Sequence, residues 1–297
     1  MCQSESPVFA MLEAYLSKLD DAPFSVHTIL VSENDKERYE TFLMYSFRKY
    51  QAARYHYTNI RRYLEKDYVD HEEEFKTFIE KVDGEDERLD RLYQHTTVLK
   101  TRQGADHYAY ELAAFLEALK SAVDFLARVC GFHLSGISVD SITTLMKLVR
   151  KGRSNSILAA VKNNIEWLRK LREYRHHVVH RRIISISAGG EAHIVSRAAR
   201  IAMYPVVIPE SPPAYVPDTR VSRLHDDEIL MNSERSESWI MAEDGKKKIL
   251  DLSIKYTPAF GYVSLEEFAR HHIESFEKFF TEILQALVAL QFQDLVS

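Results

Sequence analysis

The chain has 297 residues, of which 45% are hydrophobic and 28% charged, and its formal net charge is -5. This length and composition suffice to bury one large core or two smaller ones. No apolar stretch approaches the ~20 residues that span a bilayer, and the N-terminus lacks a signal peptide's basic start, so we expect no membrane role. Cys2 and Cys130 lie far apart without metal-binding or redox spacing, and a free thiol at position 2 favours a cytoplasmic protein.

The N-terminal third is expected to be helical, with a short amphipathic segment at residues 9–16. Asn34 is a plausible N-cap for a long helical pattern that contains neither proline nor glycine. The patterns predict successive helices over residues 34–68, over residues 70–80, and from the break at Asp83-Gly84 to about Leu99. Tyrosines and phenylalanines alternate with basic residues in the first of these, a pattern that suits single-stranded nucleic acid but is more often core. Gly104 marks the predicted end of a helical region over residues 1–104.

The segment from Ala105 to Cys130 has the most regular helical pattern in the chain. Its apolar residues recur every three or four positions along one face, at Leu112, Phe115, Leu116, Leu119, Val123, Leu126 and Cys130. Gly131 supplies a stop, a helix around 138–150 follows, and Gly152 ends it. Because these connections are short, we expect neighbouring helices to pack antiparallel in a bundle.

After Arg182 the pattern changes from helical to alternating. Short strands are predicted over residues 183–187, 193–195, 201–208 and 249–254, with Pro205 at an edge or a break, and a helix over residues 226–243. The chain ends in a long helix from Ser264 to about Gln293, capped by Ser264 and Glu267. The predicted fold class is therefore mainly α: an antiparallel helical bundle over 105–297, with a β-containing insertion at 183–262 and the helical N-terminal region.

Charge is distributed unevenly along the chain. Residues 147–182 contain eleven basic and two acidic side chains, a net charge of +9, whereas residues 65–91 contain twelve acidic and five basic ones. A local positive field attracts polyanions even when the whole protein is acidic. The alternative is a solvated helix face with no ligand.

The twelve residues Leu171–Arg182 contain three histidines and four arginines, at the end of an amphipathic helix. Arg175 lies in the middle of the apolar face that Ile165, Leu168, Leu171, Val178 and Val179 form. A guanidinium is costly to bury alone, so Arg175 needs a carboxylate, a phosphate or a water-filled cleft. Asp124, near the end of the preceding long helix, is a hypothetical carboxylate to orient it.

The run Arg175-His176-His177-Val178-Val179-His180, at the end of a bundle helix and preceded by the amphipathic helix 105–130, resembles the HEPN superfamily. The resemblance implies a compact helical bundle. It also implies metal-independent RNA cleavage by a homodimer with a shared cleft, although other members only bind nucleotides or act as scaffolds. Arg175 and His180 match the Arg-x4-His motif, and His176 stands where a polar residue positions the arginine or shares proton transfer.

Metal-independent cleavage deprotonates the 2′-hydroxyl, stabilises the attacked phosphate and protonates the leaving oxygen. In this hypothesis His180 transfers protons and Arg175 contacts the scissile phosphate. The RNA backbone contacts Arg169, Arg172, Arg181 and Arg182. We expect no cofactor and no metal. The expected partners are RNA, a second copy of the chain and an antitoxin or regulatory protein, because relatives of this type are often toxins or anti-phage effectors.

Two alternatives stay open for these residues. His176 and His180 have the i, i+4 spacing of a metal-binding pair, but no third ligand is obvious and the neighbouring arginines would repel a cation. The stronger alternative is a non-catalytic RNA-binding, nucleotide-binding or protein-interaction module. Positions five apart on a helix differ by about 140°, which favours a site completed at a helix end or across two chains.

Overall fold

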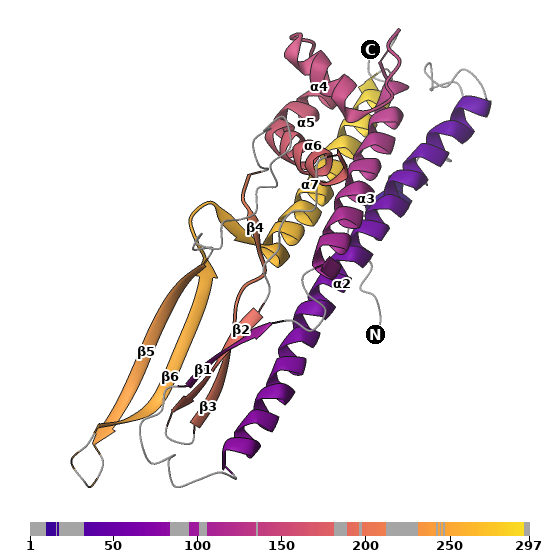
Figure 1. The fold of residues 1–297 in the computed structure, drawn as a ribbon. Helices are drawn as coiled ribbons and strands as arrows, with labels where there is room; N and C mark the ends of the chain where they lie inside the picture. The colour runs from indigo at the N-terminus through magenta and orange to yellow at the C-terminus, as the bar shows by residue number, and fades with distance from the viewer. Residues whose placement is uncertain are drawn as a thin grey trace. The chain divides into compact units, whose positions relative to one another are not determined.

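The computed structural model shows a mainly α-helical protein with small antiparallel sheets, as predicted (Figure 1). The residues that the structure describes are 10–15, 17, 33–83, 95–100, 106–134, 136–180, 189–195, 198–211, 231–241, 243, 245 and 247–293. No helix among them is both long enough and apolar enough to cross a membrane.

The chain divides into two compact units. The first comprises Met1–His56, Ala113–Val179 and Arg270–Ser297, and the second comprises Tyr57–Leu112 and His180–Ala269. Both units draw residues from either side of Gly104. Gly104 itself lies outside the described residues, so the boundary predicted there stays a prediction.

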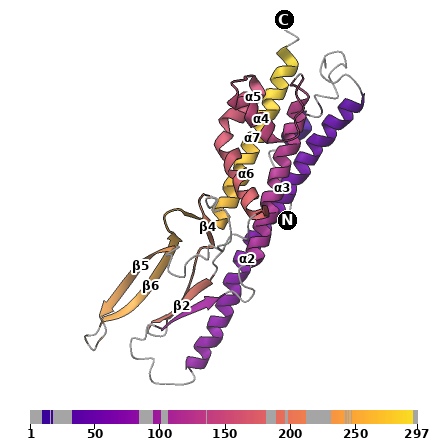
Figure 2. The ribbon, with the colours of Figure 1, turned by 45° about the horizontal axis from the view of Figure 1, so that its top comes forward.

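Helices build the first unit, and four of them also contribute residues to the second. Their bounds are α2 Glu33–Asp83, α3 Asp106–Gly131, α4 Ile142–Arg150, α5 Ser156–Asn163, α6 Ile165–His180 and α7 Leu265–Gln293. Residues 10–15 are also helical. Figures 1 and 2 both show α3 beside α7 in the first unit.

The core of the first unit consists of the faces that the sequence pattern predicts. All seven predicted apolar residues of α3 are fully or almost fully buried, and so are Phe276, Phe279, Phe280, Ile283 and Leu287 of α7. The Tyr50 ring of α2 stacks on Phe276 with centroids 5.0 Å apart. Ser46 Oγ of α2 donates a hydrogen bond to the Ala122 carbonyl of α3 over 2.8 Å. Apolar burial at this density is the main stabilising term for the unit.

Several predicted helix ends are confirmed. Ser264 Oγ accepts from the Glu267 backbone N–H over 3.2 Å and donates to the Glu267 carboxylate over 2.9 Å, so it caps α7 as predicted. Gly152 follows the last turn of α4 with φ of +75°, a conformation that favours glycine. The long N-terminal pattern, however, is one helix of 51 residues, α2, rather than two, because nothing between Tyr68 and Asp70 breaks it.

The strands belong to the second unit. The sheets have the strand orders β1-β2-β3, β4-β7 and β5-β6, all antiparallel. The bounds are β1 His95–Lys100, β2 Gly189–Val195, β3 Ala198–Met203, β4 Val207–Pro209, β5 Met231–Met241, β6 Lys247–Pro258 and β7 Tyr262–Ser264. Pro205 lies in the break between β3 and β4, as predicted. The strand predicted at 183–187 lies outside the described residues.

Two predicted helices are wrong. The helix predicted to reach Leu99 is instead β1 at its end, where the β-branched residues Thr96, Thr97 and Val98 pair with β2. The helix predicted over 226–243 is instead β5 over its described part, paired along its length with β6 (Figure 2). The polar sequence of β5 has no strand pattern of its own, so cross-strand pairing with the alternating residues of β6 decides its structure.

Candidate functional site

Helix α6 is fixed in the first unit at its start and along one face. The Asn164 amide donates to the Ala160 carbonyl over 2.9 Å and to Glu282 of α7 over 2.8 Å. Leu168, Leu171 and Tyr174 are almost fully buried. Of the apolar face predicted for this helix, Leu168 and Leu171 pack in the core, whereas Ile165 and Val178 are half-buried. The buried side determines which α6 side chains face solvent.

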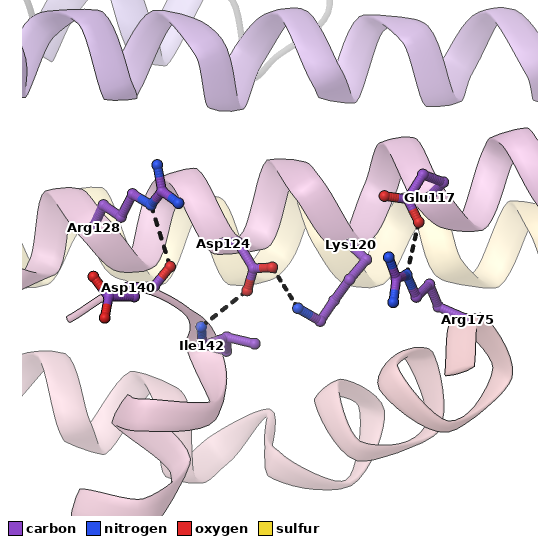
Figure 3. Close-up of polar contacts among 7 residues, drawn as sticks. All are labelled: Glu117, Lys120, Asp124, Arg128, Asp140, Ile142 and Arg175. Carbon is purple, nitrogen blue, oxygen red and sulfur yellow. Dashed lines mark hydrogen bonds and ion pairs between the residues drawn. The ribbon is translucent and has the colours of Figure 1, made fainter. Parts of the chain in front are cut away.

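Arg175 lies at the edge of that buried face and forms an ion pair with Glu117 of α3. Arg175 Nε donates to Glu117 Oε2 over 2.7 Å, and the two side chains are 30% and 49% exposed (Figure 3). This hydrogen bond is the main cause that raises the pKa of Arg175, and the charges of Glu117 and Asp124 raise it further. A charge-assisted contact of this length orients the guanidinium while leaving part of its surface accessible.

Asp124, the hypothetical partner of Arg175, makes its hydrogen bonds elsewhere. Its carboxylate accepts from the Ile142 backbone N–H over 3.0 Å and from Lys120 Nζ over 2.5 Å (Figure 3). Ser141, the N-cap residue of α4, makes no capping hydrogen bond with its side chain. Asp124 therefore supplies the cap of α4 from a different helix and contributes to Arg175 only through its charge.

Charged residues along one side of α3 thus contact two other parts of the first unit. Figure 3 shows Glu117, Lys120, Asp124 and Arg128 in a row on this helix. Glu117 binds α6, Asp124 caps α4, and Arg128 Nε donates to the Asp140 carbonyl over 3.2 Å. The spacing of about two helical turns from Glu117 to Asp124 explains how one helix side reaches both neighbours.

The remaining predicted site residues differ in their placement. At about 100° per residue, Arg169, Arg172, His176 and position 180 fall within an arc of about 80° on α6. Arg169, Arg172 and His176 are exposed, as this arc requires. Arg169 forms ion pairs with Glu166 over 2.9 Å and Glu173 over 3.4 Å. His180 is the last residue of α6; its side chain, together with Arg181 and Arg182, lies outside what the structure describes.

Sequence reasoning missed two residues at and near this site. Glu117 is one of several acidic residues on the polar faces of α3, and no local signal separates it from Asp124. His272 of α7 is fully buried beneath α6 and accepts a hydrogen bond from Trp167 Nε1 over 2.8 Å. Burial, followed by the charges of His271 and Lys170, lowers the pKa of His272 to about 3, so this histidine is neutral near pH 7.

Other kinds of site find little support in the described residues. The described residues include no group of three or more histidine, cysteine or carboxylate side chains placed to bind a metal. Cys130 is fully buried, and burial raises the pKa of its thiol to about 12, which disfavours a nucleophilic role.

Models of protein families, curated proteins and solved structures give no match to this chain. The resemblance to the HEPN superfamily therefore depends on the sequence pattern of this chain alone, over residues 105–182 and the C-terminal helix 264–293.

Proposed function

We propose that this protein is a HEPN-like endoribonuclease that cleaves RNA without a metal, through transesterification by the 2′-hydroxyl. The observation that supports the proposal is the ion pair between Arg175 and Glu117. This ion pair orients the half-buried guanidinium of Arg175 beside the exposed arc of α6 that contains Arg169, Arg172 and His176.

The position of Arg175 suits a phosphate contact. An arginine that projected freely into solvent would lose much side-chain entropy on binding RNA, whereas one already fixed by a carboxylate loses less. Its remaining exposed surface lies next to the arc of Arg169, Arg172 and His176. An RNA backbone that follows this arc passes the edge at which Arg175 lies.

The proposed chemistry assigns a role to each predicted residue. Arg175 contacts the scissile phosphate and stabilises the charge that develops on it, and His180 transfers protons to and from the ribose oxygens. His176 positions Arg175 or shares proton transfer. Arg169, Arg172, Arg181 and Arg182 bind the backbone, and a second copy of the chain completes the cleft. The proposal includes a cytoplasmic location and regulation by an antitoxin-like protein.

A second candidate is RNA binding without cleavage. Arg169 already forms ion pairs with two glutamates of its own helix, which weakens the positive field on the arc. Positions 175 and 180 also differ by about 140° around α6, so one copy of α6 does not present both on one face. A binding module needs the arginines alone, whereas a nuclease needs His180 to approach the same phosphate.

The test is cleavage of an end-labelled, mixed-sequence RNA in EDTA by the full chain and by Arg175→Ala, His180→Ala and Arg48→Ala. Arg48 is exposed on α2 and serves as the matched control for loss of one positive charge. We expect EDTA-resistant cleavage that yields 2′,3′-cyclic phosphate ends, lost in the first two variants and retained in Arg48→Ala. Circular dichroism of each variant confirms folding.

Each other outcome contradicts the nuclease proposal in a different way. Salt-sensitive RNA binding with no cleavage by the wild type supports the binding module instead. Cleavage that EDTA abolishes identifies a metal-dependent or contaminating enzyme. Cleavage that survives in His180→Ala removes the histidine from the mechanism.

A further inference from the structure

A pocket of about 310 Å³ lies wholly within the second unit, and none of the residues of the proposed RNA site lines it. Its lining comes from α2, from the N-terminal turn of α3, from the segment between β3 and β4, and from β6, β7 and the first turn of α7. Tyrosines and apolar side chains make up most of the lining, the carboxylates Asp67 and Glu266 also line it, and the described lining residues include no lysine or arginine.

The tyrosines form an aromatic surface. Tyr204 and Tyr256 meet edge to face, with ring centroids 4.8 Å apart and planes at 89°, and both line the pocket. Tyr68 lies at its rim, where the side chain is 47% exposed although it is large and apolar. The faces of such rings attract cations through their electrostatic quadrupole, most strongly where water is partly excluded.

The carboxylates supply negative charge beside these rings. The Asp67 side chain is only 16% exposed, and it accepts a hydrogen bond from Tyr108 Oη over 2.7 Å. His107 Nε2 lies 3.7 Å from the same Asp67 oxygen. Burial, the hydrogen bond to Asp67 and the Asp67 charge all raise the pKa of Tyr108. Near neutral pH this phenol is therefore protonated and is the donor of the hydrogen bond to Asp67.

The surroundings of Asp67 increase the negative charge. Residues 64–74 of α2 include six acidic side chains and one lysine. Glu266 also lines the pocket, although Arg61 partly offsets its charge over 3.4 Å. A partly buried carboxylate is costly to leave uncompensated, and a cation in the pocket would compensate Asp67.

We propose that this pocket binds a small organic ammonium ion of the quaternary or N-methylated class, between the tyrosine rings and Asp67. Methyl groups on nitrogen spread the positive charge over an apolar surface, which contacts aromatic rings better than a hydrated ammonium does. An anion is disfavoured by Asp67 and Glu266. A metal ion is disfavoured because most of the lining is aromatic or apolar rather than oxygen ligands.

The test compares choline with 3,3-dimethylbutan-1-ol, which has the same shape and no charge. Binding of each to the full chain is followed by titration calorimetry and by ligand-observed NMR. We expect saturable choline binding and at least about tenfold weaker binding of the neutral alcohol, the factor that a cation–π and carboxylate contribution of ordinary size provides. Equal binding of the two, or no binding of choline, overturns the proposal.

Variants then assign the binding to the pocket. Asp67→Asn removes the charge but keeps an oxygen that accepts from Tyr108, and we expect about tenfold weaker choline binding. Tyr256→Leu should weaken binding by a similar factor, whereas Tyr55→Leu, at an exposed tyrosine of α2 outside the pocket, should leave it unchanged. Unchanged affinity in Asp67→Asn, or equal losses in Tyr256→Leu and Tyr55→Leu, contradicts the assignment. The assay contains no RNA, so its result is independent of the nuclease proposal.

Discussion

The hydrogen bond from Arg175 Nε to Glu117 helps to orient the guanidinium. We predict that Glu117→Gln lowers RNA cleavage by about tenfold, because the amide weakens a charge-assisted hydrogen bond and lets the guanidinium leave its position. The free energy of unfolding should change by less than about 1 kcal/mol, since both side chains are partly exposed. Single-turnover cleavage and urea denaturation measure the two effects.

The matched control for this prediction is Glu274→Gln, which removes the same charge from an exposed position on α7. Its cleavage rate should equal that of the wild type. Equal losses in the two glutamine variants would mean that Glu117 acts through net charge rather than through Arg175.

At the scale of single residues, sequence patterns predicted that Arg175 needs a compensating group but not which one. The apolar spacing of α6 predicts Arg175 in the middle of the buried face, whereas it lies at the edge of that face with its side chain 30% exposed. Whether Glu117 or Asp124 pairs with Arg175 depends on how far α3 and α6 are offset along their axes. That offset is set by the packing of whole helices and has no local signature in the sequence.

Helix α4 depends on a neighbouring helix for its first turn, because Asp124 accepts from the Ile142 N–H where Ser141 makes no side-chain cap. We predict that Asp124→Ala lowers the free energy of unfolding by about 1–2 kcal/mol, the usual cost of losing a cap. Hydrogen exchange should accelerate most at the first amides of α4, and urea denaturation gives the global value.

Two variants separate capping from ion pairing at this position. Asp124→Asn keeps an acceptor for the Ile142 N–H and should cost less than Asp124→Ala. Lys120→Met removes only the ion pair with Asp124 and should leave exchange at α4 unchanged. Faster exchange at α4 in Lys120→Met would show that the ion pair, rather than the cap, stabilises this helix.

The contact between α6 and α7 predicts a dependence of stability on pH. The folded pKa of His272 is about 3, whereas an unfolded histidine titrates near 6.5, so between these values the unfolded state binds one more proton. The free energy of unfolding should therefore fall as pH decreases from about 6.5 toward 3, by at most about 1.4 kcal/mol per pH unit from this group. Above about pH 6.5 the contribution should be constant.

The matched variant is His272→Gln, whose amide oxygen still accepts from Trp167 Nε1 but does not titrate in this range. Urea denaturation at several pH values should show a smaller acid loss for this variant than for the wild type. Parallel pH profiles for the two proteins would mean that His272 is already protonated in the folded state.

At the scale of elements, helices with strong amphipathic patterns were predictable and pairing partners were not. The faces of α3 and α7 recur every three or four residues, and the structure buries them. The segments that form β1 and β5 lack a comparable pattern. The extended structure of β1 comes from pairing with β2, which lies far away along the chain, and that of β5 comes from pairing with β6. The structure of both segments therefore depends on pairing with another strand, which the sequence of each segment alone does not reveal.

For the whole molecule, the proposed nuclease site predicts complementation between two copies of the chain. If each cleft combines Arg175 of one copy with His180 of the other, then mixed Arg175→Ala and His180→Ala chains form heterodimers with one intact cleft. With random exchange, about half of the dimers are mixed and one of their two clefts is intact, so activity should recover to about a quarter of the wild-type level.

The controls are each inactive variant alone and sedimentation of the wild type, which should give the mass of a dimer. A mixture as inactive as its components, in a protein that sediments as a dimer and exchanges subunits, would place both residues of the site on one copy of the chain. If the wild type sedimented as a monomer, the proposed cleft between two copies of the chain would be wrong.

The two tryptophans of the chain are divided between its two compact units. Trp167 belongs to the first unit and contacts His272, while Trp239 belongs to β5 of the second. When tryptophan is excited selectively over the 16 tyrosines, a chain with Trp239→Phe reports only on the helical core, and one with Trp167→Phe reports only on the β-containing unit. The molecule has its own pair of optical reporters, so that each unfolding or binding signal can be assigned to one unit without adding a dye.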